Sequence, residues 1–187
     1  EASIYAKLKN ALGISKGLIR VYDPFQMLAE VEDEVKQLLG VDTYGIQLPV
    51  TIFGYKNENW KTFRMFDDTE VLISGNFEYD VLKNGDIVQY PKGDRSVPPS
   101  GKMPKGGYYF DTIVRQEPID EKKLDPKEWV EQTYSLYTDE DLEYLEKTSR
   151  WYYENTNYSL LGNFWGAGFG DIAIVMGPNI LHPKGIR

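Results

Sequence analysis

Two segments of strand length constrain the fold of this 187-residue chain more than any other feature. Residues 42–48 and 158–164 are mostly apolar, and each follows a segment with the periodicity of an amphipathic helix. Strands that are buried on both faces are typical of parallel sheets, in which helices cross over between neighbouring strands. We therefore expect these segments to be adjacent, parallel core strands of an α/β fold.

The helices that accompany these strands are predicted from their apolar spacing and their terminal residues. Residues 2–12 place Ile4, Leu8, Ala11 and Leu12 on one helical face, with Gly13 as a C-terminal stop. A short strand is expected at residues 18–22.

The Asp23-Pro24 pair predicts a helix that runs to Leu39 and stops at Gly40, because Asp caps free N–H groups and Pro suits a first helical position. The same signals recur at Asp125-Pro126, and Thr138 is a further predicted cap. The acidic residues 139–141 that follow Thr138 suit the first turn of a helix better than they suit a cation site.

Between the two apolar segments lies a region of alternating polar and apolar residues. Residues 62–66, 70–73 and 77–82 have strand periodicity, and Asn84-Gly85 is a strong hairpin signal. These features predict an exposed antiparallel meander from about residue 63 to residue 89, within an insertion at about 51–110. The insertion would end in a long surface loop over 91–107, with residues 108–111 as an aromatic plug where the chain re-enters the core.

Composition excludes several classes of function. A net charge of -8 argues against capture of nucleic acid or of an anionic membrane surface. There is no cysteine for a disulfide, a zinc–thiolate site or a thiol nucleophile, and the single histidine, His182, removes a two-histidine metal site. Gly166, Gly168 and Gly170 lack the spacing of a dinucleotide-binding loop. We expect a cytoplasmic protein without nucleic-acid or membrane partners, and a chain that is a piece of something larger.

Three stretches together resemble the uroporphyrinogen decarboxylase superfamily, in particular its corrinoid-dependent methyltransferase-like branch. They are residues 21–26 with the following helix and Gly40-Val41-Asp42, residues 103–111 (MPKGGYYFD), and residues 160–167 (LLGNFWGA). The resemblance implies that residues 1–187 are a single α/β domain, the N-terminal half of a TIM-type (β/α)8 barrel. A complete barrel takes about 250 residues, so only the early strands and helices are expected here.

The resemblance also implies an activity. In the full-length protein, a methyl group would pass between a corrinoid (cobalamin) carrier and an acceptor, with a corrinoid protein as partner. The zinc ligands of that branch, a His and two Cys, lie in the second half of the barrel. We therefore expect no cofactor within this chain, zinc and a corrinoid in the complete protein, and no activity from this chain alone.

Two alternatives remain open. One is activity of the uroporphyrinogen decarboxylase type, in porphyrin and tetrapyrrole metabolism. Against it, Pro49 stands where the decarboxylases have an aspartate that faces the pyrrole nitrogens. The other alternative is a non-catalytic fragment that binds a tetrapyrrole or a protein partner.

The predicted ligand site lies at the carboxyl ends of the two core strands, where barrels of this kind bind their ligands. It consists of Gln47 on one strand, and of Asn163 and Trp165 on the other. The two amides would orient a small-molecule or tetrapyrrole ligand, and the indole would supply a flat apolar wall. Alternatively, both amides bind the backbone of neighbouring loops.

Overall fold

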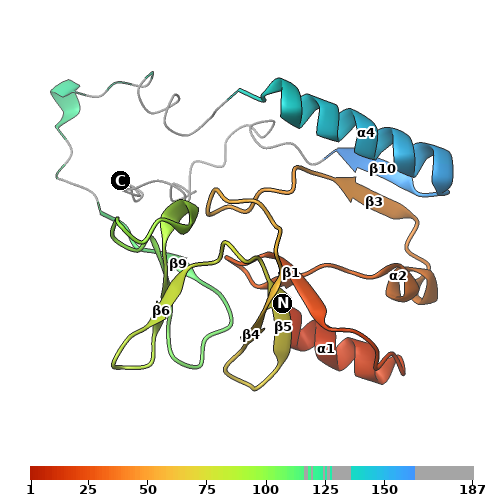
Figure 1. Ribbon diagram of the computed structural model, residues 1–187, viewed down its shortest axis with the longest axis horizontal. Coiled ribbons are helices and arrows are strands. Elements are labelled where there is room, and N and C mark those ends of the chain that lie inside the picture. Colours follow the sequence, from red (N-terminus) through yellow and green to blue (C-terminus); the bar gives the residue numbers. More distant parts are fainter. Residues whose placement is uncertain (116–117, 119, 124, 126, 128–135, 163–187) are drawn as a thin grey trace. The chain divides into compact units, whose positions relative to one another are not determined.

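The computed structural model describes residues 1–115, 118, 120–123, 125, 127 and 136–162 (Figure 1). These residues form a mixed α/β fold with three sheets, and no closed barrel is found among them. The chain divides into two compact units, which are described separately below. The first contains Glu1–Glu30 and Pro49–Lys122, and the second contains Val31–Leu48 and the described residues from 123 to 162.

The first unit holds a four-stranded sheet with the strand order β2-β1-β5-β4. Its strands are β1 (Ile19–Asp23), β2 (Leu28–Ala29), β4 (Lys61–Arg64) and β5 (Glu70–Ile73). β1 pairs with β5 in parallel, whereas the β1–β2 and β4–β5 pairs are antiparallel. Helix α1 (Ala2–Ala11) is connected to the residue before β2 by a hydrogen bond, because the N–H of Ala2 donates to the Met27 carbonyl over 2.8 Å.

A second sheet of the first unit is antiparallel throughout, with the order β6-β7-β8-β9. It consists of β6 (Tyr79–Val81), β7 (Ile87–Gln89), β8 (Gly101–Met103) and β9 (Asp111–Thr112), with a 3-10 turn, η1 (Pro91–Gly93), between β7 and β8. The aromatic core of the unit is formed by Phe53, Phe77 and Phe110, which are completely buried. Phe110 packs edge-on against both other rings, at centroid distances of 5.8 Å. A second 3-10 turn, η2 (Glu121–Lys123), lies near the end of the unit.

The second unit is built from α2 (Asp33–Leu39), β3 (Thr43–Ile46), α4 (Asp139–Asn155) and β10 (Ser159–Gly162). β3 and β10 form a two-stranded parallel sheet, and α4 packs on both strands (Figure 1). The prediction that residues 42–48 and 158–164 contain adjacent, parallel strands is therefore confirmed. β3 is shorter than the predicted 42–48, and Leu161 on β10 is 65% exposed, so the double-sided burial of a core strand is not found among the described residues.

Two helix predictions are wrong in part. α1 and its stop at Gly13 (φ 74°) are confirmed, but its inner face is formed by Ala2, Tyr5 and Lys9 rather than by Ile4 and Leu8. Positions 2, 5 and 9 have helical spacing just as 4 and 8 do. Lys9 tolerates burial because its ammonium donates to the carbonyl of Lys16 over 3.0 Å.

The predicted helix from Asp23 to Leu39 exists only at its C-terminal end. The Asp23 carboxylate does accept backbone N–H groups, from Phe25 (2.8 Å) and Gln26 (3.4 Å), but it stabilises a turn. Met27 then takes a positive φ of 51°, and the chain returns as β2. The stop at Gly40, with φ 66°, is confirmed. The helix predicted from Asp125 falls largely outside the described residues, whereas the cap at Thr138 is confirmed as a reciprocal capping box with Asp141.

The predicted meander is divided between two sheets. The hairpins β4–β5 and β6–β7 are antiparallel as expected, and no helix occurs over residues 71–81. However, β5 pairs in parallel with β1, and β6 belongs to the other sheet. The region is also not exposed, because Val71, Ile73 and Phe77 are completely buried. The predicted loop over 91–107 contains strand β8, which pairs with β7 in the antiparallel sheet.

Candidate functional site

The carboxyl ends of β3 and β10 lie at one edge of the second unit's sheet. The register runs from Thr43 opposite Ser159 to Ile46 opposite Gly162. Gln47 follows Ile46 directly and is half-buried. Asn163 and Trp165, the other two predicted site residues, lie outside the described residues. The structure therefore places one of the three predicted residues at the expected edge.

Aromatic rings and one cation connect the β3–β10 sheet to the helices, nearer to the amino ends of the two strands. The ring of Tyr44 on β3 stacks on that of Tyr152 on α4, with centroids 3.7 Å apart. The Lys36 ammonium of α2 lies 4.6 Å from the centroid of Tyr44 and 5.6 Å from that of Tyr158. Such cation–π contacts favour a fixed ring orientation. These contacts fix the strand pair of the second unit against its helices. Gln47 is the polar residue directly after the carboxyl end of β3.

A second group of polar side chains, which sequence reasoning missed, is buried in the first unit. We call Thr51, Tyr55 and Gln89 the Tyr55 cluster. Each residue is at least 94% buried, and Thr51 Oγ1, Tyr55 Oη and Gln89 Oε1 make no hydrogen bond of good geometry among the described residues, although the Thr51 and Gln89 side chains lie near enough to the Tyr55 hydroxyl to act on it as weak hydrogen-bond partners. A buried polar atom without a partner costs about 1–3 kcal/mol, so three together are unusual. No sequence signal marks them, since Gln89 stands at the end of an apolar strand and Thr51 and Tyr55 lie in a loop.

The electrostatics of the Tyr55 cluster follow from its burial. Burial raises the pKa of the Tyr55 hydroxyl far above its usual range, although the neighbouring Thr51 and Gln89 side chains act in the opposite direction. The negative charge of Asp23 adds to the increase. Burial also raises the pKa of the Asp23 carboxyl, against the lowering effect of the two N–H groups that it accepts. Tyr55 is therefore neutral at ordinary pH, and its hydroxyl is able to donate and accept hydrogen bonds but not to act as a base.

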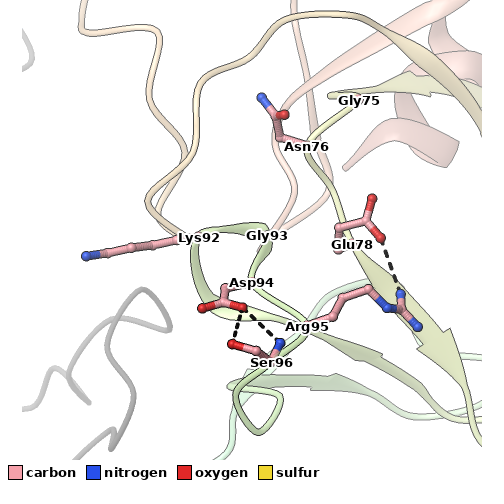
Figure 2. Close-up of a pocket in the computed structure, with 8 residues that line it drawn as sticks. All are labelled: Gly75, Asn76, Glu78, Lys92, Gly93, Asp94, Arg95 and Ser96. Atoms are coloured by element: carbon pink, nitrogen blue, oxygen red, sulfur yellow. Dashed lines mark hydrogen bonds and ion pairs between the residues drawn. The ribbon is translucent and has the colours of Figure 1, made fainter.

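Figure 2 shows a hollow on the first unit. It has a volume of about 530 Å³ and is open to solvent, between the β5–β6 connection and residues 92–96. Two of its charges pair with each other: Arg95 lies 3.3 Å from Glu78, and it also pairs with Asp80, which accepts the Tyr90 hydroxyl over 2.6 Å. The Asp94 carboxylate accepts from the N–H and hydroxyl of Ser96. This internal pairing does not indicate a ligand.

In the described part of the chain, no group of three or more His, Cys, Asp or Glu side chains is placed to hold a metal ion. None of the helices in the same residues is long and apolar enough to cross a membrane. His182 and the glycines of the 162–170 segment beyond Gly162 lie outside the described residues.

Comparison with known proteins adds no relative. The chain matches no protein-family model, no curated protein and no solved structure.

Proposed function

We propose that this chain is the N-terminal part of a methyltransferase of the corrinoid-dependent branch of the uroporphyrinogen decarboxylase superfamily. The observation that carries the proposal is the parallel pairing of β3 with β10. An antiparallel pair, or strands in different sheets, would be incompatible with the early strands of a (β/α)8 barrel. The sequence resemblance supplies the family and the reaction.

The order of elements in the second unit also supports the barrel. α2 precedes β3 and α4 precedes β10, so the unit contains two helix–strand repeats. Residues Pro49–Lys122 of the first unit are inserted between them in the sequence. Parallel neighbours need a crossover connection, usually helical, and α4 fills that role between β3 and β10. A barrel repeat with a long inserted region accounts for this order.

Within the proposal, the ligand meets the edge at which Gln47 follows β3. The amide of Gln47 donates and accepts hydrogen bonds, and Asn163 and Trp165 follow β10 in the sequence. The chain contains no cysteine and one histidine, so it does not itself supply the His and two Cys that the family uses to hold zinc. Its own contribution is ligand orientation at the strand ends, and the metal chemistry is assigned to the remainder of a full-length protein.

The test is a methyl-transfer assay with the intact natural gene product. Methylcobalamin and a thiol acceptor are supplied together, and demethylation of the corrinoid is followed by its absorption spectrum. Thiol-dependent demethylation above the rate without enzyme is expected. Two further assays separate the alternatives. Uroporphyrinogen consumption without methyl transfer would replace the proposal with a decarboxylase, and binding of a tetrapyrrole without turnover would replace it with a binding module.

A further inference from the structure

The β3–β10 sheet has one face against helix α4 and one open face. Tyr44 stacks on Tyr152 of α4, so the face that carries Tyr44 is the one that packs on the helix. Successive side chains of a strand point to alternate faces, which places Gly45 on the open face. Leu161 of β10 lies directly across from Gly45 in the register and is 65% exposed. Extended to Gln47, which directly follows β3, the same alternation assigns this amide to the face of Gly45.

Nothing in the described part of the chain requires a glycine at position 45. Gly45 has no positive φ, and a Cβ atom added to it would have no other atom within 4 Å. Gly75, Gly101 and Gly107 also lack a positive φ, but at each of them an added Cβ would lie within 3.0 Å of another atom. A glycine weakens the interior of a strand, and it often marks a place where a ligand or another backbone approaches closely. The open face at Gly45 leaves room for such an approach.

We propose that Gly45 sets the size of the ligand that binds at the carboxyl end of β3. The inference rests on the function proposed above, in which helices surround a barrel and the sheet face opposite them lines its interior. Barrel interiors are usually filled by branched apolar side chains, whereas Gly45 leaves its place empty. An apolar part of the ligand then lies against the β3 backbone beside Leu161, while Gln47 hydrogen-bonds a polar atom of the same ligand. A side chain at position 45 would occupy that space.

Gly45→Ala and Gly45→Val in the full-length protein test this role. Binding is measured by titration with methylcobalamin and, separately, with uroporphyrin, each followed by quenching of tryptophan fluorescence. For a probe that the wild type binds, Gly45→Val should weaken binding about tenfold or more and Gly45→Ala by less, because the added side chain takes space that the ligand needs. The melting temperature should stay unchanged or rise, since valine suits a strand better than glycine. Thr43→Val is the control, because it places the same side chain at the exposed amino end of β3 and should leave binding unchanged.

The binding and methyl-transfer measurements separate this inference from the proposed function. Equal affinities of wild type and Gly45→Val for a probe that the wild type binds would overturn the inference and leave the proposed function unaffected. Weaker binding together with a lower melting temperature would also overturn it, because Gly45 would then serve the fold. Weaker binding at an unchanged melting temperature, in a protein that transfers no methyl group, would support the inference and contradict the methyltransferase function. If the wild type binds neither probe, both proposals fail.

Discussion

The ring of Tyr44 lies against the ring of Tyr152, with centroids 3.7 Å apart and planes inclined by 24°. Tyr44 belongs to β3 and Tyr152 to α4, so this contact fastens the helix that precedes β10 to the strand beside β10. Almost 100 residues of sequence separate the two elements. The stacking therefore stabilises the helix–strand arrangement on which the parallel pair depends.

We expect Tyr44→Ala and Tyr152→Ala to destabilise the chain in a coupled way. Aromatic pairs contribute about 0.5–1.5 kcal/mol beyond the area that they bury, so a double-mutant cycle in urea should give a coupling free energy in that range. Tyr153→Ala is the control, because its side chain is 79% exposed on the same helix. If the double variant lost only the sum of the unfolding free energies that the two single variants lose, the stacking would not hold the helix in place.

Phe110 should be far more important for stability than its neighbour Tyr109. Phe110 is completely buried between Phe53 and Phe77, whereas Tyr109 is 59% exposed. Phe110→Ala is expected to lower the free energy of unfolding by about 3–5 kcal/mol. Tyr109→Ala should change it by less than about 0.5 kcal/mol. Urea denaturation of both variants measures the difference, and similar losses would contradict the core described above.

The pH dependence of stability should reveal the half-buried Asp23. Its folded-state pKa is raised above the usual 3.8, so the folded chain holds this proton more tightly than the unfolded chain. Stability contributed by Asp23 is therefore present below pH 3.8 and is lost as the pH rises through the raised value. Asp23→Asn keeps an acceptor for the N–H groups of Phe25 and Gln26 but cannot ionise. Relative to wild type, this variant should become more stable as the pH rises.

Asp80 provides a control, because its pKa is shifted in the opposite direction and the expected pH dependence of stability is reversed. The Tyr90 hydroxyl and Arg95 lower the pKa of its carboxyl, so the stability that it contributes is lost as the pH falls. Relative to wild type, Asp80→Asn should become less stable as the pH rises through the acid range. Urea midpoints for the three proteins at a series of pH values test both trends. Parallel curves for wild type and Asp23→Asn would show that Asp23 is not perturbed by burial.

The parallel strand pair was predictable because it follows from local pattern, whereas the sheets of the first unit were not. Residues 42–48 and 158–164 are mostly apolar, and each comes after a helix, so their pairing is a general consequence of α/β architecture. The β1–β5 pair depends on contact between Ile19 and Val71, and alternation within residues 70–73 does not specify a parallel partner. A hairpin signal such as Asn84-Gly85 fixes only its own two strands.

The prediction of a helix from Asp23 failed because its side chain has two compatible uses. The Asp23 carboxylate caps free N–H groups in a turn as readily as in a helix, and the positive φ of Met27 has no sequence signal. Gln47 was chosen as a candidate because an amide at the end of an apolar strand is unusual, and its place directly after β3 follows from the strand pattern. The Tyr55 cluster was not predicted, because Gln89 comes 34 positions after Tyr55 in the sequence and the two meet only through tertiary contacts.

We expect this chain alone to show no decarboxylation of uroporphyrinogen. In the register that the resemblance implies, Pro49 would stand where the decarboxylases place a carboxylate, and a proline side chain offers neither charge nor a hydrogen-bond donor to the pyrrole nitrogens. Its carbonyl, moreover, accepts the N–H of Asn57 over 2.9 Å. Purified chain incubated with uroporphyrinogen should give product only at the background rate, as measured by chromatography of the oxidised porphyrins. Product formation above background would contradict this prediction and support the decarboxylase alternative.

The strand-end site itself is tested by Gln47→Ala and Asn163→Ala in the full-length protein. Gln47 follows the last pair of the β3–β10 register, and Asn163 follows Gly162, the last residue of β10. If the two amides orient the ligand, both variants should lower ligand binding or methyl-donor turnover while the melting temperature stays nearly unchanged. Gln37→Ala is a matched control, because this amide is exposed on α2. Wild-type turnover in both site variants, or a loss of several degrees of thermal stability, would show that the amides serve the fold by binding neighbouring backbone.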